Sequence, residues 1–124
     1  DALVLAVPLD RWRLWRRGFN QSVLIARPLA RALGLSLHLD ALVRVRATGS
    51  MRGLGRRARL RRVQGAFVVP PQHRKDIAGR NILLVDDVMT TGATLSACAR
   101  ALRRAGAERV YVLAFARVVE VGGH

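Results

Sequence analysis

A four-residue apolar run, Ile82 to Val85, ends in two adjacent carboxylates, Asp86 and Asp87. A buried strand cannot continue into two charges, because burying an unpaired carboxylate is very costly. We therefore predict a central strand over this run, with both acids at its carboxyl end. That end of a strand is where open α/β sheets bind their ligands, so this stretch constrains the fold and the site together.

Hydroxyl groups and a glycine follow the acids where a helical pattern begins, at Thr90, Thr91, Gly92 and Thr94. Backbone N–H groups at such a helix start bind anions, and the stretch lacks the Gly-Lys-Ser/Thr of a Walker A loop. The helix is predicted from about Gly92 to Ala105 and ends at Gly106. Its apolar face is predicted to contain Leu95, Cys98, Ala99 and Leu102.

Strands alternate with helices along the rest of the chain. A helix is predicted over Gln21 to Leu33, with a kink at Pro28, an end at Gly34, and a buried stripe at Val23, Ala26, Ala30 and Leu33. The alternation predicts an α/β fold, a mostly parallel sheet flanked by helices. The other strands are predicted over Leu3 to Val7, Ala66 to Val69 and Arg109 to Arg117, and within Leu35 to Val45, where the best position is Ala41 to Val45. A polar connection is predicted over 72–80 and a loose tail over 118–124.

The length of 124 residues and the 51% hydrophobic content indicate a single domain spanning residues 1–124. The sequence begins at Asp1 directly on a strand-like segment, so we interpret the chain as truncated at its N-terminus. No apolar run is long enough to span a bilayer and no signal-peptide pattern opens the chain. We therefore expect a cytoplasmic protein without a membrane partner, whose only cysteine, Cys98, is a small core residue.

The formal net charge is +14, and Lys75 is the only lysine. Such a charge favours phosphates, nucleotides or nucleic acid as partners, although a general preference for arginine in the genome would also raise it. The arginines concentrate in a loop over residues 9–21 and in a glycine-rich segment over about 46–65. We predict the second segment to be a flexible basic loop with a short helix.

The stretch VDDVMTTGAT, residues 85–94, resembles the phosphoribosyl-pyrophosphate motif of type I phosphoribosyltransferases. The resemblance implies that fold, and it implies that the catalytic acids Asp86 and Asp87 hold the ribose hydroxyls, directly or through Mg²⁺. It also implies a loop that holds the 5′-phosphate. The matching loop residues are Val88, Met89, Thr90, Thr91, Gly92, Ala93 and Thr94.

The RGFNQ segment, residues 17–21, is similar to one in the competence protein F group, a branch associated with DNA uptake, and the likeness extends over nearly the whole chain. In this family the loop after the first strand approaches the pyrophosphate. The group usually carries a four-cysteine zinc module, absent from these residues, and commonly has glutamine at Met51 and glutamate at Ala58. The implied candidates are Arg17, Gly18, Asn20 and Gln21 in the pyrophosphate loop, and Arg56 and Arg59 in the flexible loop.

Two hypotheses follow from the resemblance. In the first, the protein binds phosphoribosyl pyrophosphate, or a nucleoside monophosphate, together with Mg²⁺. Transfer of the phosphoribosyl group to a base is left open, and the sequence does not identify that base. In the second, it is a non-catalytic accessory of DNA uptake whose arginine-rich loop, around Arg52 to Arg62, binds single-stranded DNA or a partner such as a competence helicase. A homodimer fits either hypothesis.

Overall fold

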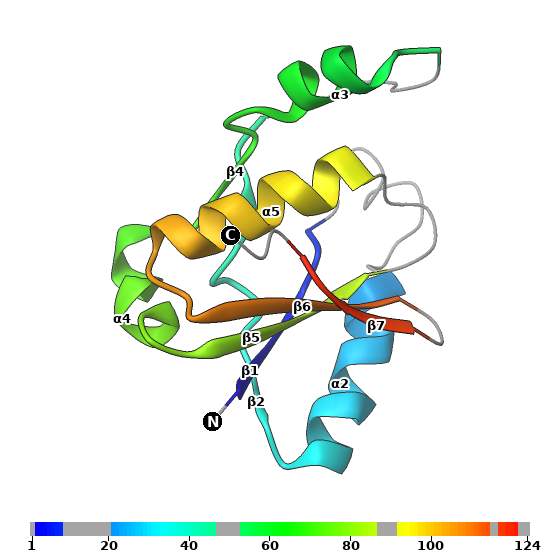
Figure 1. Ribbon diagram of the computed structural model, residues 1–124. Helices are drawn as coiled ribbons and strands as arrows, with labels where there is room; N and C mark the ends of the chain where they lie inside the picture. Colours follow the sequence, from blue (N-terminus) through cyan, green and yellow to red (C-terminus); the bar gives the residue numbers. More distant parts are fainter. Residues whose placement is uncertain (1, 9–20, 47–52, 87–91, 115–116, 122–124) are drawn as a thin grey trace.

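The structure is a computed structural model that describes residues 2–8, 21–46, 53–86, 92–114 and 117–121. Its main sheet has five strands in the order β2-β1-β5-β6-β7. The first four strands are mutually parallel and β7 is antiparallel to β6, which confirms the predicted mostly parallel sheet (Figure 1). The strands are β1 (Ala2–Ala6), β2 (Ser36–Leu37), β5 (Asn81–Asp86), β6 (Arg109–Ala114) and β7 (Arg117–Glu120).

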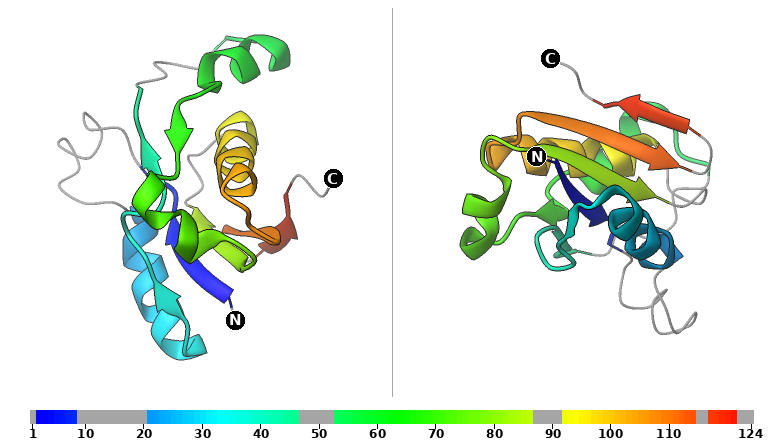
Figure 2. Two further views of the ribbon diagram at one scale, coloured as in Figure 1. Left: turned by 90° about the vertical axis from the view of Figure 1, so that its left-hand side faces the viewer. Right: turned by 90° about the horizontal axis from the view of Figure 1, so that it is seen from below.

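Helices cover both faces of this sheet. Helix α2 (Gln21–Leu33) lies on one face and helix α5 (Gly92–Arg104) on the other (Figure 2). The core is divided accordingly. A large cluster of buried side chains fills the α5 side of the sheet, and a smaller one containing Val4, Ala26 and Ala30 fills the α2 side.

The side chains of β5 alternate between these two clusters. Ile82 and Leu84 lie in the α5-side core, whereas Val85 lies in the α2-side core with Leu83 packed against it. Successive residues of a strand point to opposite faces of the sheet. Asp86, two residues after Leu84, therefore falls on the face that α5 covers.

A second small layer covers α5 on the side away from the sheet. Strands β3 (Val43–Arg44) and β4 (Phe67–Val68) pair antiparallel. Helix α3 (Arg56–Val63), which lies between them in the sequence, belongs to the same layer. Both α3 and β4 pack against α5, which therefore lies between two layers (Figure 1). A helix buried on more than one side needs small residues that allow close approach, and the buried residues of α5 include Ala97, Ala99 and Ala101.

The segment predicted as a polar connection contains two short helical turns. They are η1 (Pro71–His73) and α4 (Arg74–Ile77). Pro71 stands at the first position of η1, where a missing N–H costs nothing, and Ile77 is fully buried in the α5-side core. The sequence did not predict these helical turns, because only one of their residues, Ile77, is buried in the core and no apolar periodicity results.

Two glycines end the principal helices as predicted. At the end of α5, Gly106 has φ +98 and its N–H donates to Arg103 O, while the N–H of Ala107 donates to Leu102 O. Gly34 ends α2 with the same pair of hydrogen bonds, the arrangement of a Schellman motif. At Gly106 a Cβ atom would lie 3.3 Å from the backbone of Ala78, so glycine is needed there for space as well as for conformation.

Three expectations drawn from the sequence are wrong. The second strand of the main sheet is β2, which lies within the wider range Leu35 to Val45 but not at the preferred position over Ala41 to Val45. Ala41 and Leu42 are buried in a bend, and Val43 and Arg44 belong to the separate β3–β4 pair. The expected tail contains β7, whose valines are β-branched and favour strands.

The third concerns the stripe of α2, where Leu33 is 54% exposed. The turn at Gly34 brings Leu35 back onto the α2-side core instead. The helix runs through Pro28, which is exposed.

Among the described residues, none of the helices has the length and apolar character of a membrane span.

Candidate functional site

The candidate site lies at the carboxyl end of β5, in the middle of the sheet. The N–H of Val7 donates to Val85 O over 2.9 Å, so the pairing of β1 with β5 continues one residue past β1. On the other side, Asp86 pairs in register with Ala114 of β6. Hydrogen bonds on both sides therefore fix the backbone of β5 up to its terminal acid.

Asp86 is 2% exposed at this end of β5. The helix that follows, α5, begins at Gly92, and its amino end lies at the same edge of the sheet (Figure 1). The first N–H groups of a helix have no partner within it and carry a partial positive charge. This edge thus combines a buried carboxylate, which can accept hydrogen bonds, with a helix start whose partial positive charge suits an anion.

The structure brings together four of the residues singled out in the sequence. Asp86 ends β5, and Gly92, Ala93 and Thr94 form the first turn of α5, with Thr94 buried. Helix α2 begins at Gln21, and its amino end lies at the same edge of the sheet (Figure 1). The other candidates from these loops lie outside the described residues: Arg17, Gly18, Asn20, Asp87, Val88, Met89, Thr90 and Thr91.

Arg56 and Arg59 lie elsewhere in the fold. Both belong to α3 and are exposed. Helix α5 lies between α3 and the sheet (Figure 2), so the structure does not place these two arginines against Asp86. The predicted short basic helix is confirmed, but its last residue, Val63, is fully buried in the core.

The pKa of the Cys98 thiol is affected by burial and by two charged groups near α5. Burial raises the pKa of its thiol well above the ordinary range, the guanidinium of Arg44 lowers this pKa, and the carboxylate of Asp86 raises it again. Two opposite charges thus act on one buried atom. The burial dominates, so Cys98 is a neutral core residue, as the sequence predicted, and no nucleophile.

Arg44 is a residue that sequence reasoning missed. It belongs to β3, is half-buried, and its guanidinium carbon lies 4.8 Å from the centre of the Phe67 ring, a cation–π contact. The sequence contained one indication that Arg44 is partly buried, because it lies within the apolar run ALVRV, residues 41–45. The pairing of β3 with β4, which places Arg44 beside Phe67, could not be read from the sequence.

The donors at this edge fit Mg²⁺. Mg²⁺ prefers oxygen ligands and uses one or two carboxylates together with phosphate oxygens. Asp86 provides a carboxylate at the strand end, and Asp87 follows it in the sequence. A parallel sheet with helices on both faces, an acidic strand end and a helix start beside it define the protein as an α/β protein with a candidate site at the edge where such sheets bind ligands.

Comparison with known families gives the particular class. Residues 20–120 match the phosphoribosyl transferase domain, which covers most of the chain. The chain therefore belongs to the phosphoribosyltransferase family, and the resemblance noted in the sequence is confirmed.

Two relatives carry names that refer to DNA utilization and to competence. The chain is 40% identical over 116 residues to the DNA utilization protein YhgH of Escherichia coli O157:H7. It is 36% identical over 114 residues to competence protein F of Haemophilus influenzae. The alignments cover 94% and 92% of this chain and 49% of each relative, so the chain spans about half the length of the curated relatives it matches.

A solved structure supports the same fold. The glutamine phosphoribosylpyrophosphate amidotransferase of B. subtilis, determined with ADP and GMP, superposes with a TM-score of 0.57 at 23% identity. The superposition covers 92% of this chain and 22% of that one. It identifies the predicted type I phosphoribosyltransferase fold.

The burial of Cys98 is testable with a thiol reagent such as dithionitrobenzoate. In the folded protein at pH 8 we expect reaction at least about 100-fold slower than in denaturant, because the thiolate is the reactive form and burial disfavours it. Since Cys98 is the only cysteine, the absorbance change reports this site alone. Equal rates in the folded and denatured protein would contradict the placement of Cys98 against the core.

Proposed function

We propose that this protein binds phosphoribosyl pyrophosphate, or a nucleoside monophosphate, with Mg²⁺ at the carboxyl end of β5, and that it acts in DNA uptake or utilization. The observation that carries the proposal is the position of Asp86, buried at the end of the central strand and followed by the first turn of α5. The names of the two relatives suggest the biological context.

The chemistry of the edge suits such a ligand. The Asp86 carboxylate accepts hydrogen bonds from the ribose hydroxyls, and these charge-assisted bonds are the stronger kind. The backbone N–H groups at Gly92, Ala93 and Thr94 donate to the 5′-phosphate, with the helix dipole favouring its charge. In this arrangement the carboxyl end of β5 binds the ribose hydroxyls, and the amino end of α5 binds the 5′-phosphate of the same ligand.

Asp86 and Asp87 are the residues that would hold Mg²⁺, directly or through water. When bound, Mg²⁺ neutralises charge on a diphosphate. Arg17 in the loop after β1 adds a forked donor for the same anionic group. The loop of Arg17 joins β1 to α2, and both of those ends lie at the carboxyl edge of the sheet (Figure 1).

Transfer of the phosphoribosyl group to a base is the reaction that this arrangement would support. A protein that orients the sugar by its hydroxyls and phosphate fixes the anomeric carbon, and such positioning lowers the barrier to displacement. The residues proposed above act by binding and orienting. None of them identifies the acceptor base.

Calorimetry with phosphoribosyl pyrophosphate and Mg²⁺ tests the binding. We expect a saturable heat that Asp86→Asn and Asp87→Asn together weaken at least about tenfold, because each lost charge-assisted hydrogen bond is worth about 1.5–3 kcal/mol. The matched control is Asp40→Asn, which removes an exposed carboxylate away from the site and should change nothing. An intact protein that gives no heat would refute the proposal.

A second candidate function is suggested by α3. Its sequence RRARLRRV holds five arginines and no acidic residue, and all five arginines are exposed. A row of exposed guanidinium groups binds phosphate backbones with little regard to sequence. We propose it as a surface for single-stranded DNA, which would link the ligand site to DNA uptake through a different face of the same domain.

Fluorescence anisotropy with single-stranded DNA tests this surface. We expect log affinity to fall linearly with log salt, and Arg56→Ala with Arg59→Ala to reduce the slope by about 1.4, since each phosphate contact contributes about 0.7. The control, Arg27→Ala with Arg31→Ala, removes the same charge from exposed positions of α2 and should leave the slope nearly unchanged. Equal effects of the two pairs would mean that only net charge matters.

A further inference from the structure

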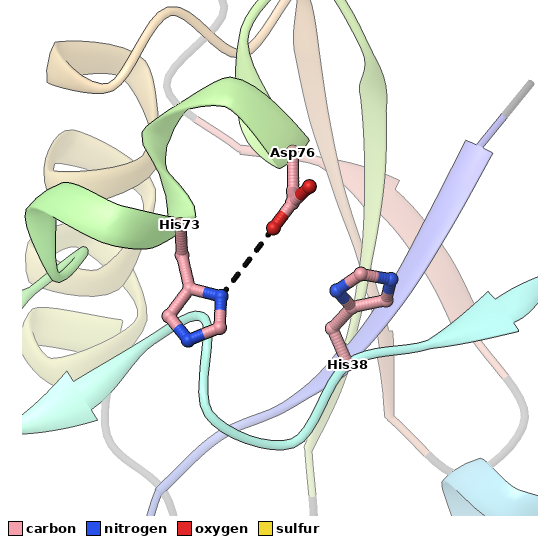
Figure 3. A group of neighbouring side chains, drawn as sticks. All are labelled: His38, His73 and Asp76. Atoms are coloured by element: carbon pink, nitrogen blue, oxygen red, sulfur yellow. Dashed lines mark hydrogen bonds and ion pairs between the residues drawn. The ribbon is translucent and has the colours of Figure 1, made fainter.

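Two histidines and an aspartate gather at the edge of the fold away from β5's terminal acid. His38 directly follows β2, His73 ends η1, and Asp76 lies in α4. One ligand atom from each lies within 4.8 Å of the other two. Figure 3 shows the three side chains pointing toward one space, His73 and Asp76 from the helical turns and His38 from the segment that follows β2.

The backbone on both sides of this cluster is held in place. The N–H of His38 donates to Val4 O over 3.0 Å, which ties it to the sheet. Leu42, four residues further, and Ile77, next to Asp76, are both buried in the α5-side core. The three side chains are therefore presented by fixed segments that are 35 residues apart in the sequence.

The side chains of His73 and Asp76 form a long hydrogen bond or ion pair, at a spacing that also suits two ligands of one metal ion. His73 Nδ1 lies 3.4 Å from Asp76 Oδ2, whereas N–H···O hydrogen bonds are usually about 2.7–3.2 Å long. Bonds of about 2.0–2.1 Å from zinc to nitrogen and oxygen place neighbouring ligands of a tetrahedral site about 3.4 Å apart. This pair already has the spacing of two ligands of one ion, and a ligand atom of His38 lies within 4.8 Å of both.

We propose that His38, His73 and Asp76 form a site for Zn²⁺. Two imidazoles with one carboxylate suit a borderline transition ion and disfavour Mg²⁺. Three protein ligands leave the fourth position to water or to a group from a partner. The side chains of His73 and Asp76 are 26% and 31% exposed, so that position opens to solvent.

The bound ion would join the turn after β2 to the segment that leads into β5. Because β2 is a two-residue strand at the edge of the sheet, a bond across to α4 would stabilise the part of the sheet with the fewest hydrogen bonds. The site is separate from the proposed ribose-phosphate site and does not depend on it.

Calorimetry of the untagged 124-residue chain with ZnCl₂ tests the proposal. We expect one Zn²⁺ per chain, unaffected by excess Mg²⁺, with binding at least about tenfold weaker in His38→Asn, in His73→Asn and in Asp76→Asn. Bound Zn²⁺ should also raise the midpoint of thermal unfolding. Co²⁺ in its place should give visible absorption bands that are lost in the same variants.

His124→Asn is the matched control, because it removes the third histidine of the chain and should leave Zn²⁺ binding unchanged. Circular dichroism without metal verifies that each variant is folded, and the partly exposed positions of all three ligands favour this. Zn²⁺ binding that is absent in the intact chain, or retained in all three ligand variants, would overturn the proposal.

Discussion

The parallel pairing of β5 with a strand on each side is the constraint on which the rest of the structure depends. Five residues of β5 are in register with β1 and all six with β6. Parallel strands need both faces covered by helices, and α2 and α5 provide this cover. Because the pairing continues to Val85 and Asp86, the acid at the end of β5 has a fixed position at the ligand edge of the sheet.

Helix α5 connects the sheet to the rest of the molecule, because it packs against β6, β4 and α3. Its first turn forms part of the candidate site, its middle packs on the sheet and on the β3–β4 layer, and its last turn ends at Gly106 against Ala78. The side chains that allow such close packing are alanines and Cys98. A cysteine that would be a candidate nucleophile in an open loop is here a spacer between two layers, and its raised pKa is a consequence of that packing.

The ligand edge and the basic surface are separate features of one small domain. Asp86 is buried on the sheet side of α5, while the arginines of α3 are exposed on the far side of the same helix (Figure 2). Helix α5 contacts both the sheet and α3, so it connects the two features.

The sequence predicts those parts of the fold that depend on local patterns. The apolar run before Asp86, the stripe at Ala26 and Ala30, and the closing glycines identified β5, α2, α5 and the parallel sheet. Features that depend on contacts distant in sequence were missed. Strand β2 forms because β1 offers a partner, β7 because β6 does.

The cluster at His38 was missed for the same reason. His73 and Asp76 share a face by their spacing of three residues, but His38 joins them only through its hydrogen bond to β1. In the candidate site, the acid and the first turn of α5 follow from the motif. The contact of Arg44 with the Phe67 ring, outside this site, follows from the β3–β4 pairing.

We propose that the β5–α5 edge holds a ribose phosphate. The most direct measurement is a titration of the isotopically labelled chain with phosphoribosyl pyrophosphate and Mg²⁺, followed by backbone amide chemical shifts. The account predicts saturable changes that concentrate at Asp86 and at Gly92 to Thr94, with little change at the far end of α5 near Arg104. Changes confined to α3, or spread evenly over the arginine-rich surface, would contradict it.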